Sequence, residues 1–520
     1  MVLYTHTASV STILRIIARI AKLAVILMLS ACTVGPDFKR PTAPDVKSYT
    51  DNDQLKQTPQ TLVAGRDIPA QWWTVFHSKP LTALIEKAIK HNPDLASAQA
   101  TLIQAQEIAT AKQGSLFPAI DASVYGVRQK VAGAQFGNPA FRGSVFELYN
   151  TSVNVSYTLD VFGGVRRQIE DLSAQSEYQH FQLEGAFLTL ANNIVTTAIQ
   201  AASLKAQIVA TEEIIDAQSQ QLNVIKQQFE LGGVAKAAVL AQQSTFEQTK
   251  TTLPPLQQQL AQVRHRLSVL VGDYPNNDLT KDFNLSELTL PDKLPLTIPS
   301  KLVVQRPDVR AQEAVLHSTS AQIGVVTASI FPDFTISADI GSIATQVGNL
   351  FMPGSLIWNF GGKLVQPVFH GGDFTHKKKA AVAAYQEAAG QYRSTVLQAF
   401  QNVADVLSAL DYDAAELKAQ EAAEGTAHES LELTRSQFQI GAVSYLALLT
   451  AERDYQQARI GQIKAKATRL ADTAALFQAL GGGWWNRVDL AKQIMAEQKK
   501  HEKPCGLIEC LLNPLANQVP

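Results

Sequence analysis

The chain repeats its own landmarks at a nearly constant offset, and this constrains its fold more than any other feature. The Phe-Pro pair at 117–118 recurs at 331–332, 214 residues later (332 − 118), and the Pro-Asp pair at 93–94 recurs at 307–308 with the same offset. Glycine landmarks follow in the same order, with 163–164 matched by 371–372, 232 by 441 and 272 by 481. Such order indicates a tandem duplication of roughly 200 residues, which predicts two copies of one supersecondary unit.

Composition limits the classes of protein to consider. The formal net charge is −1, so no strong electrostatic attraction to nucleic acid is expected. Charged residues make up 18% of the chain and aromatic residues 7%. This balance is more typical of extended helices that pack through small side chains than of a protein with a large aromatic core.

The N-terminus has the layout of a secretory signal. Basic Arg15, Arg19 and Lys22 precede an apolar run at 23–29, which is too short to cross a bilayer as a helix. The small residues before Cys32 resemble a bacterial lipobox, so we expect residues 1–31 to be removed and Cys32 to become a lipid-modified N-terminus. Several acyl chains would anchor it firmly. An ordinary signal with an incidental cysteine is the alternative.

The C-terminal tail, 486–520, contains the two remaining cysteines, Cys505 and Cys510. In an oxidising compartment their spacing predicts a local disulfide, with two free thiols as the alternative. Together with His501 they are too few to close a zinc shell, so no metal site is expected.

Between these ends we divide the chain into a leader at 32–80, a first repeat at 81–290 and a second repeat at 291–485. Each repeat is predicted to contain a helix, a β-hairpin, a long helix and a return helix. The Asn-Pro pair at 92–93 predicts an N-cap followed by a first-turn proline of a new helix. Apolar residues recur with steps of three and four after this pair and along 382–410, as in coiled-coil seams. The long helix of the first repeat is expected at 165–230 and its return helix at 234–270.

The period changes to two at 152–162, which predicts a strand with one apolar and one polar face. The apolar positions expected to face lipid are Val153, Val155, Tyr157, Leu159 and Val161. Other strands are expected at 119–128, 334–340 and 356–369. Asp160 and Asp339 fall on the polar faces of the predicted strands, where they are candidates to line a lumen. We favour simple solvation of these carboxylates over a selective role.

These strands require assembly. Four strands cannot close a barrel, and open sheet edges are not tolerated in lipid, so several protomers must combine their strands. About ten residues suffice for a tilted crossing. A lipid-tethered periplasmic coiled-coil scaffold without a channel is the structural alternative, but a scaffold needs no lipid-facing alternation.

Several short motifs resemble those of TolC-like outer-membrane efflux lipoproteins of the NodT type, which serve resistance-nodulation-division systems. They are the Cys-Thr-Val-Gly-Pro-Asp-Phe run at 32–38, the Trp pair at 72–73, the duplicated Phe-Pro, the Gln-Arg-Pro-Asp-Val-Arg run at 305–310, and the Leu-Gly-Gly-Gly-Trp run at 480–484. The resemblance extends over nearly all of 32–485.

The resemblance implies a mainly helical fold with a membrane β-barrel. A homotrimer would form a 12-stranded outer-membrane barrel, with four strands from each protomer, continuous with a 12-helix periplasmic α-barrel. The implied role is a passive exit duct for small molecules, including drugs, joined to an inner-membrane pump through a periplasmic adaptor. A channel for type I protein secretion is the nearest alternative. No cofactor is implied besides the lipid on Cys32.

Two sites carry over from the resemblance. The helix turns are expected to form the periplasmic tip that docks the adaptor, at Leu231, Gly232, Gly233, Val234, Ile440, Gly441, Ala442 and Val443. A periplasmic gate is expected at Leu446, Thr450, Gln437 and Phe438. Relatives often have an Arg-Tyr pair and an Asp in this region, so we expect a gate held more by packing than by ion pairs. Arg435, Arg453 or Asp454 are possible substitutes.

Motifs for catalysis are missing from the sequence. It contains no H-E-x-x-H, no P-loop and no G-x-S-x-G, and the glycines at 481–483 are better interpreted as a helix stop than as a phosphate loop. An enzyme is therefore not expected.

Overall fold

The computed structural model describes residues 33–50, 60–132, 143–276, 279 and 283–487. The chain forms two compact units, and each takes segments from both halves of the sequence. We call the first the strand unit (Met1–Arg40, Ile103–Tyr178 and Gln312–Tyr392) and the second the helix unit (Pro41–Leu102, Gln179–Ala311 and Arg393–Pro520).

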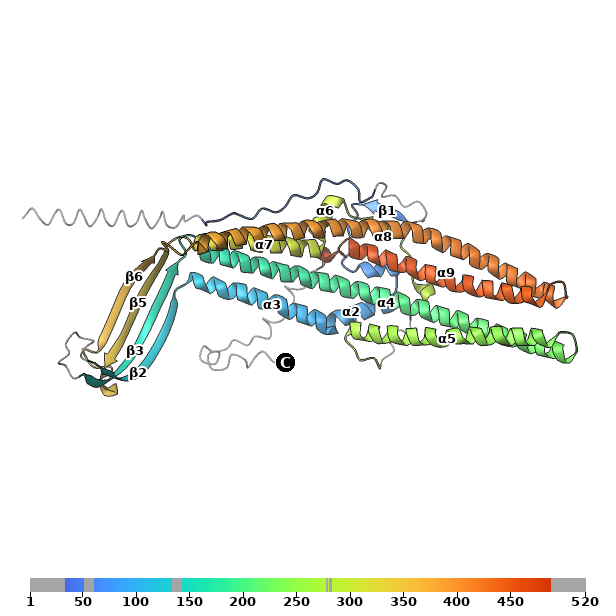
Figure 1. Ribbon diagram of the computed structural model, residues 1–520, viewed down its shortest axis with the longest axis horizontal. Helices are drawn as coiled ribbons and strands as arrows, with labels where there is room; N and C mark the ends of the chain where they lie inside the picture. Colours follow the sequence, from blue (N-terminus) through green and yellow to red (C-terminus); the bar gives the residue numbers. More distant parts are fainter. Residues whose placement is uncertain (1–32, 51–59, 133–142, 277–278, 280–282, 488–520) are drawn as a thin grey trace, which may run out of the picture. The chain divides into compact units, whose positions relative to one another are not determined.

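The same order of long elements, helix–strand–strand–helix–helix, occurs in both halves (Figure 1). The first half contains β1 (Thr61–Ala64), η1 (Trp72–Phe76), α2 (Lys79–His91), α3 (Pro93–Gln113), η2 (Gly114–Leu116), β2 (Ala119–Val131), β3 (Ser144–Leu159), α4 (Gly164–Glu230) and α5 (Lys236–Val271). The second half contains η4 (Leu285–Glu287), β4 (Lys293–Leu296), α6 (Pro299–Gln305), α7 (Pro307–Ala328), β5 (Asp333–Ala344), η5 (Val347–Asn349), β6 (Leu356–Val365), α8 (Asp373–Gln439), α9 (Tyr445–Ala479) and η6 (Trp484–Asn486).

The strand unit contains one antiparallel sheet in the order β2-β3-β5-β6. All four expected strands are present, but their bounds differ from the prediction. β3 begins at Ser144 and ends at Leu159, so assigning Val161 to a strand was wrong. Val161 lies in the turn between β3 and α4, where its amide donates to the carbonyl of Leu159 at 2.9 Å. Gly163, which has φ of 77°, ends this turn directly before α4. Periodicity alone does not locate such a change of direction.

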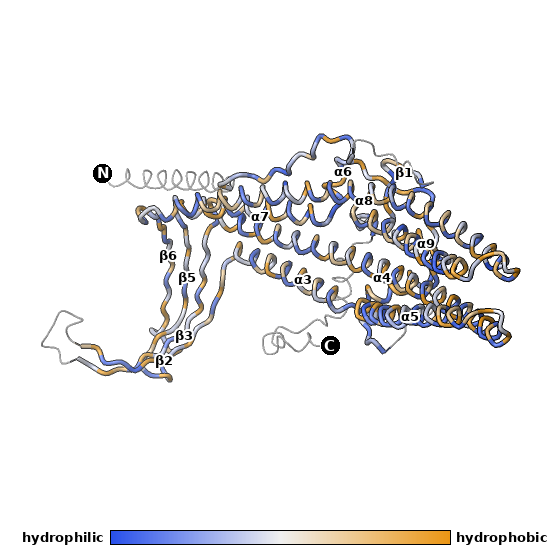
Figure 2. Tube along the Cα trace, turned by 45° about the vertical axis from the view of Figure 1, so that its right-hand side comes forward, coloured by the Kyte–Doolittle hydropathy of each residue, from blue (hydrophilic) through white to orange (hydrophobic). Residues whose placement is uncertain are grey.

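The register aligns the two predicted faces across the whole sheet. One row of paired positions is apolar, and the next row is polar. The apolar row is Ala122, Val153, Ile340 and Trp358, and the polar row is Asp121, Asn154, Asp339 and Asn359. Hydrophilic and hydrophobic residues accordingly alternate along the strands (Figure 2).

The helix unit is built from two antiparallel helix pairs, α4 with α5 and α8 with α9, each joined by a tight turn (Figure 1). The long and return helices expected at 165–230 and 234–270 are present as α4 and α5. Among the described residues, no helix has the combination of length and hydropathy that a membrane crossing needs.

α5 contains the adjacent prolines Pro254 and Pro255 and still runs unbroken to Val271. A proline inside a helix loses a hydrogen bond and strains the preceding turn. The flanking Leu253 and Leu256 pack against a buried cluster, and burial of apolar area offsets part of that cost. The cluster consists of Ala201, Leu204, Ile208, Leu260 and Val263.

Aromatic residues of the leader fill the centre of the helix unit. Trp72 and Trp73 are each 1% exposed, and Trp72 stacks on Phe477 with ring centroids 5.3 Å apart. β1 and β4 pair in parallel and join the leader to 293–296. The expected N-cap is confirmed, because Asn92 Oδ1 accepts a hydrogen bond from the Leu95 amide at 2.9 Å.

Candidate docking tip and gate

The two helix turns close in the same way. After α4, the amide of Gly233 donates to Gln228 O at 2.7 Å and Gly232 has φ of 77°. After α8, the amide of Ala442 donates to Gln437 O at 2.9 Å and Gly441 also has φ of 77°. This pattern satisfies the last helix carbonyls and requires a left-handed residue, which glycine adopts without strain.

Both turns expose apolar side chains. Leu231 is 87% exposed and Ile440 is 81% exposed. A Cβ added at Gly232 or Gly441 would meet nothing within 4 Å, so within this chain the turn conformation alone explains these glycines. The other expected tip residues, Gly233, Val234, Ala442 and Val443, lie in the same two turns. Docking of an adaptor here stays a prediction.

The expected gate residues have different surroundings. Leu446, in the first turn of α9, is 71% exposed, and Thr450 donates its hydroxyl to the Leu446 carbonyl at 3.0 Å. Phe438 instead packs on Tyr445, with centroids 5.5 Å apart, against a cluster of Leu431, Leu448 and Ala451. Gln437 is the residue whose carbonyl closes the turn. Exposure in a single chain leaves Leu446 available to line a pore.

The charged residues considered as gate links pair locally. Arg435 contacts Glu432 at 2.9 Å, one turn away in α8, and Arg453 lies 3.7 Å from its neighbour Asp454 in α9. Exposed pairs of this kind contribute little to stability. These ion pairs therefore do not join one helix pair to the other.

A polar link between helices lies beside this cluster, and sequence reasoning did not predict it. The Tyr445 hydroxyl donates to Gln242 Oε1, and Gln242 Nε2 donates to the carbonyl of Gln218 at 3.4 Å. Gln242 is 0% exposed and also hydrogen-bonds the carboxyl of Glu452, whose pKa is raised by burial. The link joins α4, α5 and α9. Gln242 is one glutamine among many in its helix, so no local signal distinguishes it.

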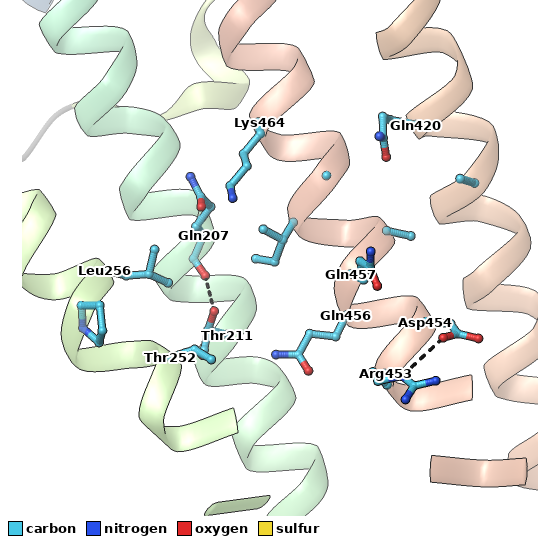
Figure 3. Close-up of a pocket in the computed structure, with 15 residues that line it drawn as sticks. Gln207, Thr211, Thr252, Leu256, Gln420, Arg453, Asp454, Gln456, Gln457 and Lys464 are labelled. Atoms are coloured by element: carbon cyan, nitrogen blue, oxygen red, sulfur yellow. Dashed lines mark hydrogen bonds and ion pairs between the residues drawn. The ribbon is translucent and has the colours of Figure 1, made fainter. Parts of the chain in front are cut away.

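A groove of about 860 Å³ lies between the helix pairs (Figure 3). Its lining is rich in amides, with Gln207 of α4, Gln420 of α8 and Gln457 of α9. Gly461 brings α9 close to α8, since a Cβ there would lie 2.5 Å from Gln420 Oε1. The described residues hold no group of three or more His, Cys, Asp or Glu that fits a metal ion.

The strand faces carry the expected chemistry. On the polar face, the hydroxyls of Ser123 and Ser152 lie 2.9 Å apart and those of Thr158 and Thr335 3.3 Å apart. On the other face, Val153 is 41% exposed, Val155, Tyr157 and Leu159 are half-buried, and Trp358 is 73% exposed. A bare apolar face of this extent marks an interaction surface for lipid or protein.

Asp160 has a structural role that periodicity did not predict. Its carboxylate accepts hydrogen bonds from the amides of Val165 at 2.8 Å and Arg166 at 3.0 Å, and Arg166 Nε reaches it at 3.0 Å. It therefore caps the first turn of α4, where a negative charge is favoured. The expected lipidation site, Cys32, and the expected disulfide pair, Cys505 and Cys510, lie outside the described residues.

Comparison with known proteins identifies the family. The model of the outer membrane efflux protein family matches residues 84–273 and 298–482. The cation efflux system protein CusC of Escherichia coli K12 is 26% identical over 463 residues, which cover 88% of this chain and 98% of CusC. The probable efflux pump outer membrane protein TtgC of Pseudomonas putida KT2440 is 27% identical, over 92% of this chain and 97% of TtgC.

Solved structures agree with this assignment. The outer-membrane channel OprN superposes with a TM-score of 0.79 at 25% identity, covering 87% of this chain and all of OprN. The CmeC outer membrane channel of Campylobacter jejuni has a TM-score of 0.82 at 22% identity, over 90% and 98% of the two chains, and shows the shared fold.

A fold of this kind, with a membrane-type sheet and long paired helices, defines an outer-membrane channel protein. The chain belongs to the outer membrane efflux protein family, and the expected role in efflux across the outer membrane is confirmed. This is a family of transport proteins rather than of enzymes.

Proposed function

We propose that three copies of the chain assemble into a passive exit duct with a 12-stranded barrel and a 12-helix tunnel. The single observation that carries the proposal is the four-stranded sheet, which has one apolar face, one polar face and unpaired edges at β2 and β6. Closure between copies pairs those edges, directs the apolar face to lipid and the polar face to water. A periplasmic scaffold without a channel would not require a sheet with one apolar and one polar face.

The duct works with a periplasmic adaptor and an inner-membrane pump. CusC is named as a cation efflux system protein, and a relative from Pseudomonas putida is named as a toluene efflux pump outer membrane protein. Their cargoes differ while the chains align over most of their length, which supports a duct that does not select its cargo. The adaptor docks at the exposed turns around Leu231 and Ile440, where bare apolar side chains gain most from burial.

The N-terminus is proposed to carry lipid on Cys32. A relative from Salmonella typhimurium, 25% identical over 473 residues, is named probable outer membrane lipoprotein SilC. Metabolic labelling with palmitate tests this directly. Label should enter the parent protein and be lost in Cys32→Ala, and equal labelling of both would contradict lipidation.

Single-channel conductance of the purified trimer tests the duct and its gate together. A ring of Leu446 side chains resists wetting, so Leu446→Ser should raise the open conductance severalfold. Leu433→Ser, at a side chain 60% exposed on α8, is the matched control and should leave conductance near the parent value. If neither the parent protein nor any variant conducts, the proposed duct is overturned. Equal conductance of Leu446→Ser and the parent would overturn only the gate.

A further inference from the structure

A small cavity of about 220 Å³ lies in the helix unit, between α4 and the pair formed by α8 and α9. It shares no lining residue with the groove of Figure 3. A water molecule takes up about 30 Å³ in the liquid, so the cavity has room for several waters or for one small organic molecule. Drug-sized ligands usually occupy larger pockets, of about 300–1,000 Å³. Its size therefore limits the occupant to water or a small molecule.

Two buried side chains of the cavity lining have polar atoms without a partner among the described residues. Gln218 of α4 is 2% exposed, and neither its Oε1 nor its Nε2 has a hydrogen-bond partner in that part of the chain. Glu452 of α9 is 6% exposed, and its Oε2 is likewise unpaired within the described ranges. Buried polar atoms are nearly always hydrogen-bonded, because an unpaired one has lost water without gaining a partner. Three such atoms around one cavity indicate a site for a polar ligand.

The charges of the lining favour a cation as that ligand. Arg435 already pairs with Glu432 at 2.9 Å, and Arg459 pairs with Glu424 at 3.2 Å. The lining also contains the carboxyl groups of Glu213 and Glu452, whose charge these two pairs do not balance. Burial raises the pKa of the Glu452 carboxyl, and the charge of Arg435 does not fully offset this rise. A cation beside a buried carboxylate would favour its ionised form.

The unpaired atoms also define which hydrogen bonds a ligand can make. Glu452 Oε2 and Gln218 Oε1 are acceptors, which an ammonium group needs because all of its N–H groups donate. Gln218 Nε2 is a donor, as is Arg459 Nε, which is buried and unpaired among the residues that the structure describes. These two donors suit a hydroxyl or carbonyl oxygen. The rings of Tyr455 and His428, with centroids 5.2 Å apart, belong to the same lining, and an aromatic face attracts a cation.

We propose that this cavity binds a small organic cation, an ammonium compound with a hydroxyl or carbonyl group a few bonds away. The ammonium donates to Glu452 and Gln218, so the ligand connects α9 to α4. The polar link of Gln242 lies beside the site, because Gln242 bonds the carbonyl of Gln218 and the carboxyl of Glu452. The bound ligand therefore strengthens the contact between the two helix pairs. The site depends on the cavity of a single chain.

Isothermal titration calorimetry on the purified full-length protein in nanodiscs tests the site. The probe is 4-amino-1-butanol, and 1,4-butanediol is its neutral counterpart with the same carbon chain. The amine should bind saturably with a Kd of about 1 mM or tighter, and the diol at least about tenfold more weakly. Equal binding of the two compounds would overturn the proposal. So would the absence of saturable binding by the amine, which would mean that the cavity takes water only.

Two variants locate the binding. Glu452→Gln removes the charge and keeps the shape of the side chain, and Gln218→Leu removes the amide. Each should weaken binding of the amine at least about tenfold, because each takes away an acceptor for the charged group. Glu416→Gln, at an exposed carboxylate of α8 outside the cavity lining, is the control and should bind the amine like the parent. Parent-like binding by Glu452→Gln or by Gln218→Leu would overturn the proposal.

Melting temperatures without ligand separate a ligand site from a structural role. Gln218→Leu removes a buried amide whose two polar atoms are unpaired among the described residues, so it should melt no lower than the parent. A clear drop in its melting temperature would contradict the assignment of Gln218 to ligand binding. If Glu452→Gln does not fold, the binding measured with Gln218→Leu decides alone.

Discussion

Individual buried charges in the helix unit depend on a few distant partners. Arg469 is 1% exposed and donates to the carbonyl of Leu410 and to Gln60 Oε1 of the leader. Asp472 lies one turn away with its Oδ2 buried. Burial and a hydrogen bond with Asp413 raise the pKa of Asp472, while the charge of Arg469 opposes the rise. The neutral form of Asp472 is therefore favoured in the folded protein.

Asp472→Asn should stabilise the protein increasingly as pH rises. A carboxyl with a raised folded pKa contributes its full stability below the unfolded value of about 4 and loses it as pH rises toward the folded value. Asn stays neutral, so its advantage should grow across that window, by about 1.4 kcal/mol for each unit of pKa difference. Urea unfolding from pH 4 to 9 measures the trend. The exposed Asp216→Asn is the control, and parallel profiles for Asp472→Asn and parent would contradict the assignment.

Tyr445→Phe should lower stability without loss of packing area. The change keeps the ring against Phe438 but removes the donor to Gln242, which is fully buried. An unsatisfied buried acceptor costs about 1–3 kcal/mol. Chemical denaturation should detect this shift, and Tyr412→Phe, at a ring 73% exposed, should change little. A Tyr445→Phe protein as stable as the parent would show that the link carries no net energy.

At the scale of elements, the sheet register places adjacent residues of a strand on faces of different polarity. Val153 pairs with Ala122 and Ile340, whereas Asn154 pairs with Asp121 and Asp339. One step along β3 thus exchanges the apolar face of the sheet for the polar face. The long helices lack this property, because their apolar residues recur with steps of three and four and not with a period of two.

Val153→Arg should impair insertion of the sheet, while Asn154→Arg should be tolerated. An arginine on the lipid face costs about 2–4 kcal/mol near the bilayer centre, but the same residue toward water costs little. Folding into lipid vesicles, followed by heat-resistant migration on gels, compares the two variants. Equal folding yields would mean that the two faces of the sheet are not distinguished by lipid.

At the scale of the whole molecule, the edge strands of the sheet, β2 and β6, need further strands to pair with in a membrane. Four strands per chain predict three copies for a 12-stranded closure, and native mass spectrometry in detergent should give three times the mass of the mature chain. A stable monomer would contradict the proposed trimeric barrel. The measured mass also reports whether acyl chains are present.

The assembled gate should respond weakly to salt. The ion pairs Arg435–Glu432 and Arg453–Asp454 each lie within one helix, so screening these two pairs breaks no link between one helix pair and the other. Raising KCl from about 0.1 to about 1 M should increase single-channel conductance only in proportion to the bulk solution. A much steeper rise would indicate a gate locked by charge.

Sequence reasoning succeeded where the signal is local. The turns at Gly232 and Gly441, the N-cap at Asn92 and the alternation around Val153 depend on residues a few positions apart. It failed where the chain changes direction, since Val161 continues the alternation beyond the end of β3. The return helix expected at 234–270 is confirmed as α5 although it contains Pro254 and Pro255, whose local preference is against a helix.

The sequence by itself determined which segments are helices and strands and which strand face is apolar, because these follow from repeating periods along the chain. Only the tertiary structure decided the partners of Gln242 and Arg167. Their contacts join residues 203 and 130 positions apart, Tyr445 to Gln242 and Arg167 to Asp37. Such pairs are set by how whole elements pack, and a single glutamine or arginine carries no local mark of its partner.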